Sequence, residues 1–313
     1  MRQVWWNGKL IPESEARVSI YDSALMFGDC CFEMTRSFNK LQFKLKEHLE
    51  RLMRSVRYVR IPLEMTVDEL RAACYDVIDA NEPEFELDDE HRLMINVTRG
   101  LLSTYKDVDI PKGPNVIISD FPLRWTTAGM GKLFDTGINC VIPSQRAIPA
   151  FLLEPKVKSR SRLHYLMANI EVAQHKGENN WALMLDPDGF ITEGPGYNFF
   201  IIKDGVPITP HERNALRGIS QRYIYELCIG IVSRANIAPY DIYEADEAFV
   251  TATPFCMLPV TSLNGIAIGD GKPGSMYSEI LKYWSKQVGV DIKAQIQTWD
   301  RGGNVGASTY SFK

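Results

Sequence analysis

Residues 154–174 read EPKVKSRSRLHYLMANIEVAQ, a cluster of lysines and arginines that leads directly into an apolar, helix-forming segment. If the chain around Val157 is a strand, Lys156 and Lys158 project from the same face, because alternate side chains of a strand point the same way. Such a pair is usually a solvated edge. A desolvated lysine can instead form a Schiff base with a carbonyl, since burial lowers the pKa of its amine. These residues alone favour the solvated edge.

The composition around this segment is that of a globular protein. With 313 residues, 45% of them hydrophobic, the chain exceeds the length at which single cores usually stop growing, which favours two domains. The net charge of −4 argues against nucleic acid as a partner. The segment MRQVWWNGKL is not an apolar leader and no stretch is long enough to span a bilayer, so we expect a cytoplasmic protein without membrane contact. The five histidines show no metal-ligand spacing, and no metal site is predicted.

Strand and helix patterns alternate along the chain and predict an α/β (α+β) fold with two domains. Asn7-Gly8 is a strong hairpin signal, residues 45–59 carry a helical apolar stripe, and Thr66 with Glu69 forms a capping-box pattern. A segment rich in glycine and threonine interrupts these patterns and is the candidate linker. We therefore predict a small N-terminal α/β domain over residues 1–125, an interdomain linker over 126–137 and a larger mixed-sheet domain over 138–313.

Three further motifs in the second half each have a structural and a chemical interpretation. Glu193 lies between a strand and a Gly-Pro-Gly turn, where an acid is ordinarily a surface residue. Residues 218–220 precede a helix, whose free N–H groups and dipole favour a bound anion. Thr251 and Thr253 lie at the end of a strand. Their hydroxyl groups could bind phosphate or have no functional role. None of these motifs is decisive by itself.

Taken together, in this order and spacing, the segments resemble the fold type IV pyridoxal-phosphate enzymes. This group holds branched-chain and D-amino acid aminotransferases, (R)-selective amine transaminases and aminodeoxychorismate lyase. The resemblance covers almost the whole chain and rests on RVSIYDSALMFGDCCFE, EHLERL, VTRG, VKS, TEGPGYNFF, LRGIS and TATPFCMLPV. It implies pyridoxal 5'-phosphate as cofactor, a larger C-terminal domain that binds most of it, and a homodimer.

The resemblance also implies roles for single residues. Lys158 matches the Schiff-base lysine, which reverses the interpretation made from its own segment, and Glu193 matches the acid that pairs with the pyridine nitrogen. A carboxylate there keeps the ring nitrogen protonated while the lysine amine shuttles the proton of the substrate. The other cofactor-binding positions, which include the phosphate cradle, are Arg51, Asn198, Ile219, Ser220, Ala252 and Thr253. An arginine, a helix N-terminus and a hydroxyl are the groups that a dianion needs.

The substrate-binding positions point to no single branch of the family. The strand RLMINVTRG lacks the Tyr-x-Arg motif of branched-chain enzymes and matches the VTRG of D-amino acid enzymes, so Arg99 is the first candidate for the substrate carboxylate. Arg36 and Arg124 are the reserves. Pro254 has no N–H to donate where branched-chain relatives use one, and TEGPGYNFF is closer to the (R)-amine transaminases. Apolar walls are expected from Phe27, Phe32, Phe255 and Met257, which favours hydrophobic or aromatic substrates.

Three hypotheses follow. The leading one is an aminotransferase that moves an amino group from an amino acid or amine donor to a 2-oxo acid in a ping-pong cycle. The second keeps the cofactor but performs elimination, as aminodeoxychorismate lyase does. The third is a nucleic-acid groove around KVKSRSR. The acidic net charge and the absence of interleaved aromatic residues count against it.

The sequence does not decide which residue contacts the ring oxygen of the cofactor. Leu163 stands where branched-chain relatives have a tyrosine, so Tyr165 and Arg162 are both candidates. The role of Arg160 also stays open.

Overall fold

The computed structural model describes residues 1–300, which form two compact units. The first unit comprises Met1–Trp125 together with Val157–Arg162, and the second comprises Thr126–Lys156 and, among the described residues, 163–300. The six residues around Lys158 thus pack with the first unit, although they lie far along the chain. Residues 126–137, which composition marked as a linker, pack within the second unit. Within residues 1–300, no helix is both long and apolar enough to cross a membrane.

An antiparallel sheet in the order β2-β1-β7-β6-β3 forms the first unit. Its strands are β1 (Gln3–Trp6), β2 (Lys9–Pro12), β3 (Cys30–Met34), β6 (His91–Thr98) and β7 (Asn115–Pro122). Asn7 and Gly8 join the first two strands with φ of 46° and 93°, which confirms the predicted hairpin, since a two-residue turn of this kind needs positive φ at both positions. A smaller hairpin joins β4 (Ser37–Phe38) to β5 (Leu41–Gln42).

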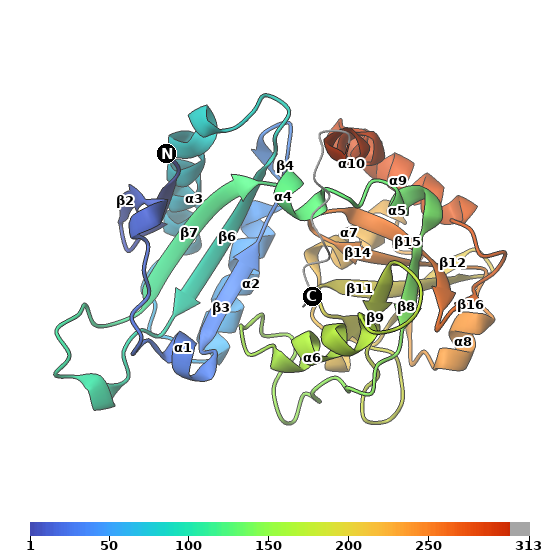
Figure 1. Ribbon diagram of the computed structural model, residues 1–313, viewed down its shortest axis with the longest axis horizontal. Helices are drawn as coiled ribbons and strands as arrows, with labels where there is room; N and C mark the ends of the chain where they lie inside the picture. The colour runs from blue at the N-terminus through green and yellow to red at the C-terminus, as the bar shows by residue number, and fades with distance from the viewer. Residues whose placement is uncertain (301–313) are drawn as a thin grey trace. The chain divides into compact units, whose positions relative to one another are not determined.

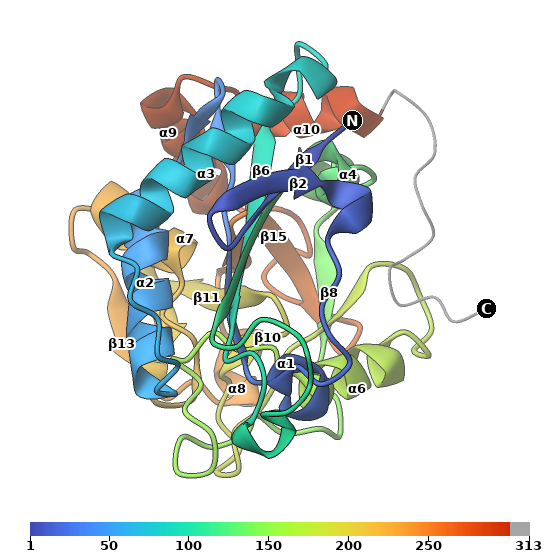
Figure 2. The same cartoon turned by 90° about the vertical axis from the view of Figure 1, so that its left-hand side faces the viewer.

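Two helices, α2 (Leu45–Tyr58) and α3 (Val67–Asn81), cover one face of this sheet, as Figure 2 shows. Leu49 and Leu52 on α2 are fully buried, as the helical stripe in the sequence predicted. Thr66 caps α3 by accepting a hydrogen bond from the Glu69 amide, and the Glu69 carboxylate accepts one from the Thr66 amide. This capping box is the predicted one. A short helix, α1 (Ser23–Phe27), precedes β3.

The segment from Val157 to Arg162 pairs with the free edge of β3. The Phe32 amide donates to the Lys158 carbonyl (2.9 Å), and the Arg160 amide donates to the Cys30 carbonyl (2.8 Å). These hydrogen bonds satisfy backbone N–H and C=O groups on the edge of β3, which would otherwise have to bond to water. Val157 also packs against the core of the first unit. The backbone of Lys158 and Arg160 is therefore held in register with β3 by residues more than a hundred positions earlier.

A mixed nine-stranded sheet forms the second unit, with the path β13-β12-β11-β14-β15-β8-β9 and two short strands beside it (Figure 1). The strands are β8 (Ile138–Val141), β9 (Asn180–Ala182), β10 (Glu193–Gly194), β11 (Tyr197–Lys203), β12 (Val206–Pro210), β13 (Ser233–Ala235), β14 (Glu247–Ala252), β15 (Cys256–Leu263) and β16 (Ile266–Ala267). Central strands such as β11 are apolar on both faces, with Phe199 and Phe200 fully buried, because helices or chain cover both sides.

Helices surround this sheet, and α7 and α9 pack against β14. The helices of the second unit are α5 (Leu133–Thr136), α6 (Leu163–Val172), α7 (Ile219–Leu227), α8 (Pro239–Tyr243), α9 (Ser275–Val288) and α10 (Ile292–Asp300), and α4 (Arg124–Thr127) crosses the boundary between the units. The helix expected after Lys158 begins at Leu163. Strands and helices thus form the mixed α/β architecture that the sequence predicted.

Candidate functional site

The two lysines of the segment Lys156–Lys158 have different surroundings. The Lys156 amine lies 2.7 Å from a carboxylate oxygen of Glu154, so its charge is neutralised by a neighbour two residues away. The half-buried Lys158 places its amine 4.7 Å from the centre of the Phe32 ring, and its backbone amide donates to Ser55 Oγ (3.2 Å). The geometry therefore separates the two lysines and gives Lys158 the aromatic, partly desolvated setting that suits a reactive amine.

A buried cluster of charged groups lies on the same unit. Arg51 Nε and Nη2 donate to the two carboxylate oxygens of Glu33 (2.6 and 2.8 Å), and His48 Nδ1 lies 2.7 Å from Glu33 Oε2. Burial alone would raise the pKa of Glu33, but Arg51 and His48 outweigh it and hold that pKa well below its usual range. Arg51, expected in the phosphate cradle, thus uses two of its nitrogens on Glu33. Sequence reasoning missed Glu33 and His48, although His48 and Arg51 lie one turn apart on α2.

Arg99, the first candidate for the substrate carboxylate, is hydrogen-bonded within the chain. Its Nε and Nη2 donate to the carboxylate of Asp29 (2.6 and 3.3 Å), and its remaining bonds reach the carbonyls of Val59 and Arg60, each at 2.7 Å. Asp29 compensates the charge of Arg99. The hydrogen bonds of Arg99 link its own segment to Asp29 and to the backbone at Val59 and Arg60. These contacts do not test whether Arg99 binds the substrate carboxylate, which stays a prediction.

The two reserve arginines are also engaged elsewhere. Arg36 is 1% exposed and stacks over the Phe38 ring at 3.8 Å, while its Nε donates to the Ser37 carbonyl. Arg124 forms ion pairs with three carboxylates, those of Glu86, Asp88 and Asp89. The prediction that Arg36 or Arg124 binds a substrate anion stays untested by these contacts. The partners of Arg124 come from residues 86–89, whereas these contacts of Arg36 are to its sequence neighbours Ser37 and Phe38.

In the second unit, Glu193 is buried and held by three donors. The Tyr165 hydroxyl donates to Oε1 (2.8 Å), and both Asn198 Nδ2 and the Leu216 amide donate to Oε2 (3.0 Å each). Glu193 on β10 lies directly opposite Asn198 on β11, so strand pairing positions the carboxylate. This carboxylate is not the surface acid of the simplest interpretation. Tyr165 is one of the two candidates for contacting the ring oxygen of the cofactor. Its hydroxyl donates a hydrogen bond to Glu193 in this structure.

The N-terminus of α7 lies beside Asn198. Its N-cap, Gly218, offers no side chain to the first amides of the helix, and a Cβ at Gly218 would stand 2.0 Å from Asn198 Oδ1, so only glycine fits here. Ile219 and Ser220 are buried. Thr251, which pairs with Asn198 across β11 and β14, has a buried hydroxyl without a hydrogen-bond partner among residues 1–300. Open amides and an unsatisfied hydroxyl fit a phosphate group.

The remaining predicted positions are divided between the two units. Ala252 ends β14 and is buried, and Thr253 and Pro254 form the turn that leads to β15. Phe255 is buried and packs against the Trp181 ring at 5.6 Å between centres. Phe32 is 2% exposed, whereas Phe27 on α1 is 66% exposed. The sequence offered Thr251 and Thr253 as candidate phosphate-binding hydroxyls. Of these two, Thr251 has a buried oxygen without a hydrogen-bond partner among residues 1–300.

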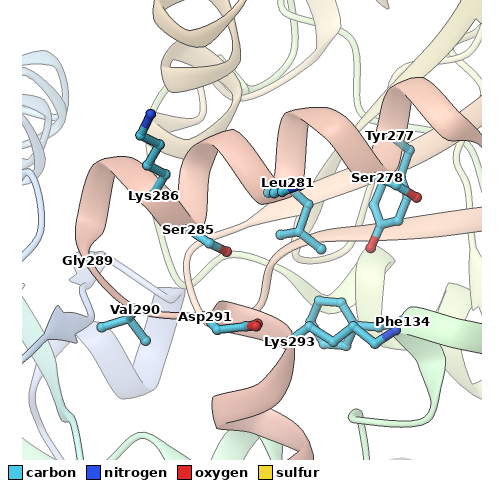
Figure 3. Close-up of a pocket in the computed structure, with 11 residues that line it drawn as sticks. Phe134, Tyr277, Ser278, Leu281, Ser285, Lys286, Gly289, Val290, Asp291 and Lys293 are labelled. Atoms are coloured by element: carbon cyan, nitrogen blue, oxygen red, sulfur yellow. The ribbon is translucent and has the colours of Figure 1, made fainter.

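A separate cavity of about 450 Å³ lies in the second unit between α9 and α10 (Figure 3). Its lining includes Phe134, Tyr277, Leu281, Lys282, Lys286 and Lys293. None of the predicted cofactor or substrate residues lines it. The cavity is therefore not part of the candidate site.

Comparisons with known proteins identify the family of the chain. Residues 30–263 match the family described as amino-transferase class IV. A putative branched-chain-amino-acid aminotransferase of Methanocaldococcus jannaschii is 31% identical over 89% of this chain and 93% of its own length. A D-alanine aminotransferase of Bacillus licheniformis is 28% identical over 89% and 94%. The crystal structure of an Escherichia coli branched-chain amino acid aminotransferase superposes with a TM-score of 0.80 at 28% identity, over 90% of this chain and 92% of that one.

Proposed function

The chain belongs to the class IV aminotransferase family and is a transaminase of fold type IV, and we propose that it uses pyridoxal 5'-phosphate to move amino groups between hydrophobic amino acids and 2-oxo acids. The observation that carries the cofactor assignment is the buried Glu193, held by Tyr165, Asn198 and the Leu216 amide. A buried carboxylate fixed by three donors is suited to accept one further proton donor, such as a protonated pyridine nitrogen.

The residues of this chain divide the work among them. Glu193 accepts the hydrogen bond of the pyridine nitrogen, and the first amides of α7 with the hydroxyls of Thr251 and Thr253 hold the phosphate. Lys158 holds the cofactor through its amine. When bound, the cofactor supplies the electron sink that makes the substrate Cα–H bond acidic. Once the amine of the substrate has displaced the Lys158 amine from the cofactor, the freed Lys158 amine would be the base that takes the proton from the substrate Cα.

A panel of donors tests this proposal. The purified protein, supplied with pyridoxal 5'-phosphate, is incubated with L-leucine, D-alanine, L-glutamate or (R)-1-phenylethylamine and no acceptor. An aminotransferase releases about one equivalent of carbonyl product per active site and then stops until a 2-oxo acid is added. Continuous product release without an acceptor would indicate a lyase, and no release from any donor would refute the proposal.

Glu193→Gln is expected to lower kcat by about a hundredfold, within the range for loss of one acid–base contribution. The amide has the size of the carboxylate but cannot keep the ring nitrogen protonated. Steady-state kinetics with the best donor measures the effect. Glu178→Gln, which changes an exposed acid of the same unit, is the matched control. Rates within twofold of the wild type for Glu193→Gln would remove this residue from the mechanism.

We also propose that the protein is a homodimer. Large apolar side chains stay exposed in residues 18–27, with Ile20 at 70%, Leu25 at 68% and Phe27 at 66%, which is typical of a surface that another chain covers. Leu25→Asp combined with Phe27→Asp is expected to convert dimer to monomer in sedimentation velocity. Leu87→Asp, at an isolated exposed leucine, should leave the dimer intact. A monomeric wild type would contradict the proposal.

A further inference from the structure

The segment that carries Lys158 also carries an arginine without a carboxylate partner. Arg160 donates from Nε and Nη2 to a single oxygen, Asn96 Oδ1, at 3.2 and 2.9 Å. Its guanidinium lies 3.8 Å from the centre of the Phe32 ring. Within residues 1–300, no aspartate or glutamate forms an ion pair with it. Arg99 and Arg124, by contrast, are both neutralised by carboxylates.

Strand pairing fixes the orientation of this guanidinium. The Arg160 amide is bonded to β3, and Phe32 on β3 lies directly opposite Asn96 on β6, so the ring and the amide project from the same face of the sheet. Met94, two residues before Asn96, presents its sulfur to Nη2 on that face (3.1 Å). The stacked ring and the amide oxygen hold Arg160 in place without cancelling its charge, since neither partner is an anion.

Three cationic groups converge on one aromatic ring. Besides Arg160, the Lys158 amine lies 4.7 Å and the Arg162 guanidinium 5.5 Å from the Phe32 centre. Desolvation lowers the pKa of Arg160, the nearby Cys30 raises it, and the charge of Arg162 lowers it. The nearby Cys30 supplies no counter-charge, because burial raises the pKa of its thiol to about 11. Such a cluster of like charges is relieved when an anion binds.

We propose that Arg160 binds the carboxylate of the substrate beside the Lys158 amine. The inference rests on the proposed function and assigns to Arg160 the recognition of the carboxylate of its amino acid and 2-oxo acid substrates. In these compounds the carboxylate is attached to the carbon that carries the amino or keto group. Because the Lys158 amine and the Arg160 guanidinium lie against the same ring, one small molecule can reach both. Arginine also meets a carboxylate with paired donors.

Binding of an unreactive carboxylate tests the inference without turnover. Hexanoate is titrated into the purified protein by calorimetry. Arg160→Gln is expected to weaken binding about 10- to 100-fold, the loss typical of a charge-assisted hydrogen-bonded pair. Arg160→Lys, which keeps the charge, should retain part of the affinity, and Arg57→Gln, at an exposed arginine of α2, should retain all of it. Equal affinity in Arg160→Gln and wild type, or a loss confined to Arg162→Gln, would overturn the inference.

Kinetics separates this inference from the proposed function. In Arg160→Gln the KM for a 2-oxo acid should rise at least tenfold, while the half-reaction with (R)-1-phenylethylamine, which has no carboxylate, should keep the rate that the wild type shows. Equal losses for both substrates would indicate a structural role and contradict the inference. If no donor reacts with the wild type, the proposed function fails. The hexanoate titration then still decides whether Arg160 is a carboxylate site.

Discussion

Lys158→Ala is expected to abolish transamination, with a rate loss of at least about 10⁴-fold, the upper range for a positioned acid–base group. Under the proposed function, this amine both holds the cofactor and moves the substrate proton, and alanine does neither. The variant should also lose the visible absorbance that a lysine-bound cofactor gives. The measurement is the half-reaction with the amino donor, followed by the visible absorbance of the cofactor and by analysis of the carbonyl product.

The matched control for this variant is Lys156→Ala. Both lysines belong to the same segment, but Lys156 pairs with Glu154, so its removal should leave rate and absorbance close to those of the wild type. Thermal unfolding of both variants checks that the segment still packs along β3. A Lys158→Ala protein that keeps its absorbance and its rate would contradict the assignment of the catalytic lysine.

Glu33→Gln is expected to reduce the free energy of unfolding by about 3–5 kcal/mol, because it leaves the buried Arg51 without its counter-ion. Glutamine keeps the size of the side chain but cannot offer two charged acceptors. Chemical denaturation measures the loss. Glu50→Gln, which removes a partly exposed acid on α2 at 3.9 Å from its partners, should change stability by less than about 0.5 kcal/mol.

The same cluster makes the protein sensitive to acid. The folded-state pKa of Glu33 is depressed, so its contribution is fully present above the ordinary value of 4.5 and is lost as the pH falls below it. Burial lowers the pKa of His48 more than Glu33 raises it, which adds a loss that begins below pH 6.5. The contribution of Glu33 and His48 to the unfolding free energy should therefore fall from about pH 6.5 downward. A similar fall in Glu33→Gln across pH 4.5 would contradict this role for Glu33.

Local chemistry made much of the fold predictable. The hairpin at Asn7-Gly8, the capping box at Thr66 and the stripe along α2 depend on residues within a few positions of one another, and each appears where the sequence placed it. The aminotransferase family was predictable for another reason, since motifs spread over most of the chain keep a fixed order. Lys158 and Glu193 were selected by that order and not by their own segments.

The partners of the arginines were decided only by the tertiary structure. VTRG singled out Arg99, yet folding brings Asp29 and the carbonyls at the end of α2 to it and leaves its charge compensated. Arg160 had no predicted role, and folding stacks it on Phe32 and bonds it to Asn96, from strands far earlier in the chain. Turns and caps are encoded by neighbours in sequence. Whether a charge is neutralised or left to meet a ligand depends on long-range partners, which no local pattern specifies.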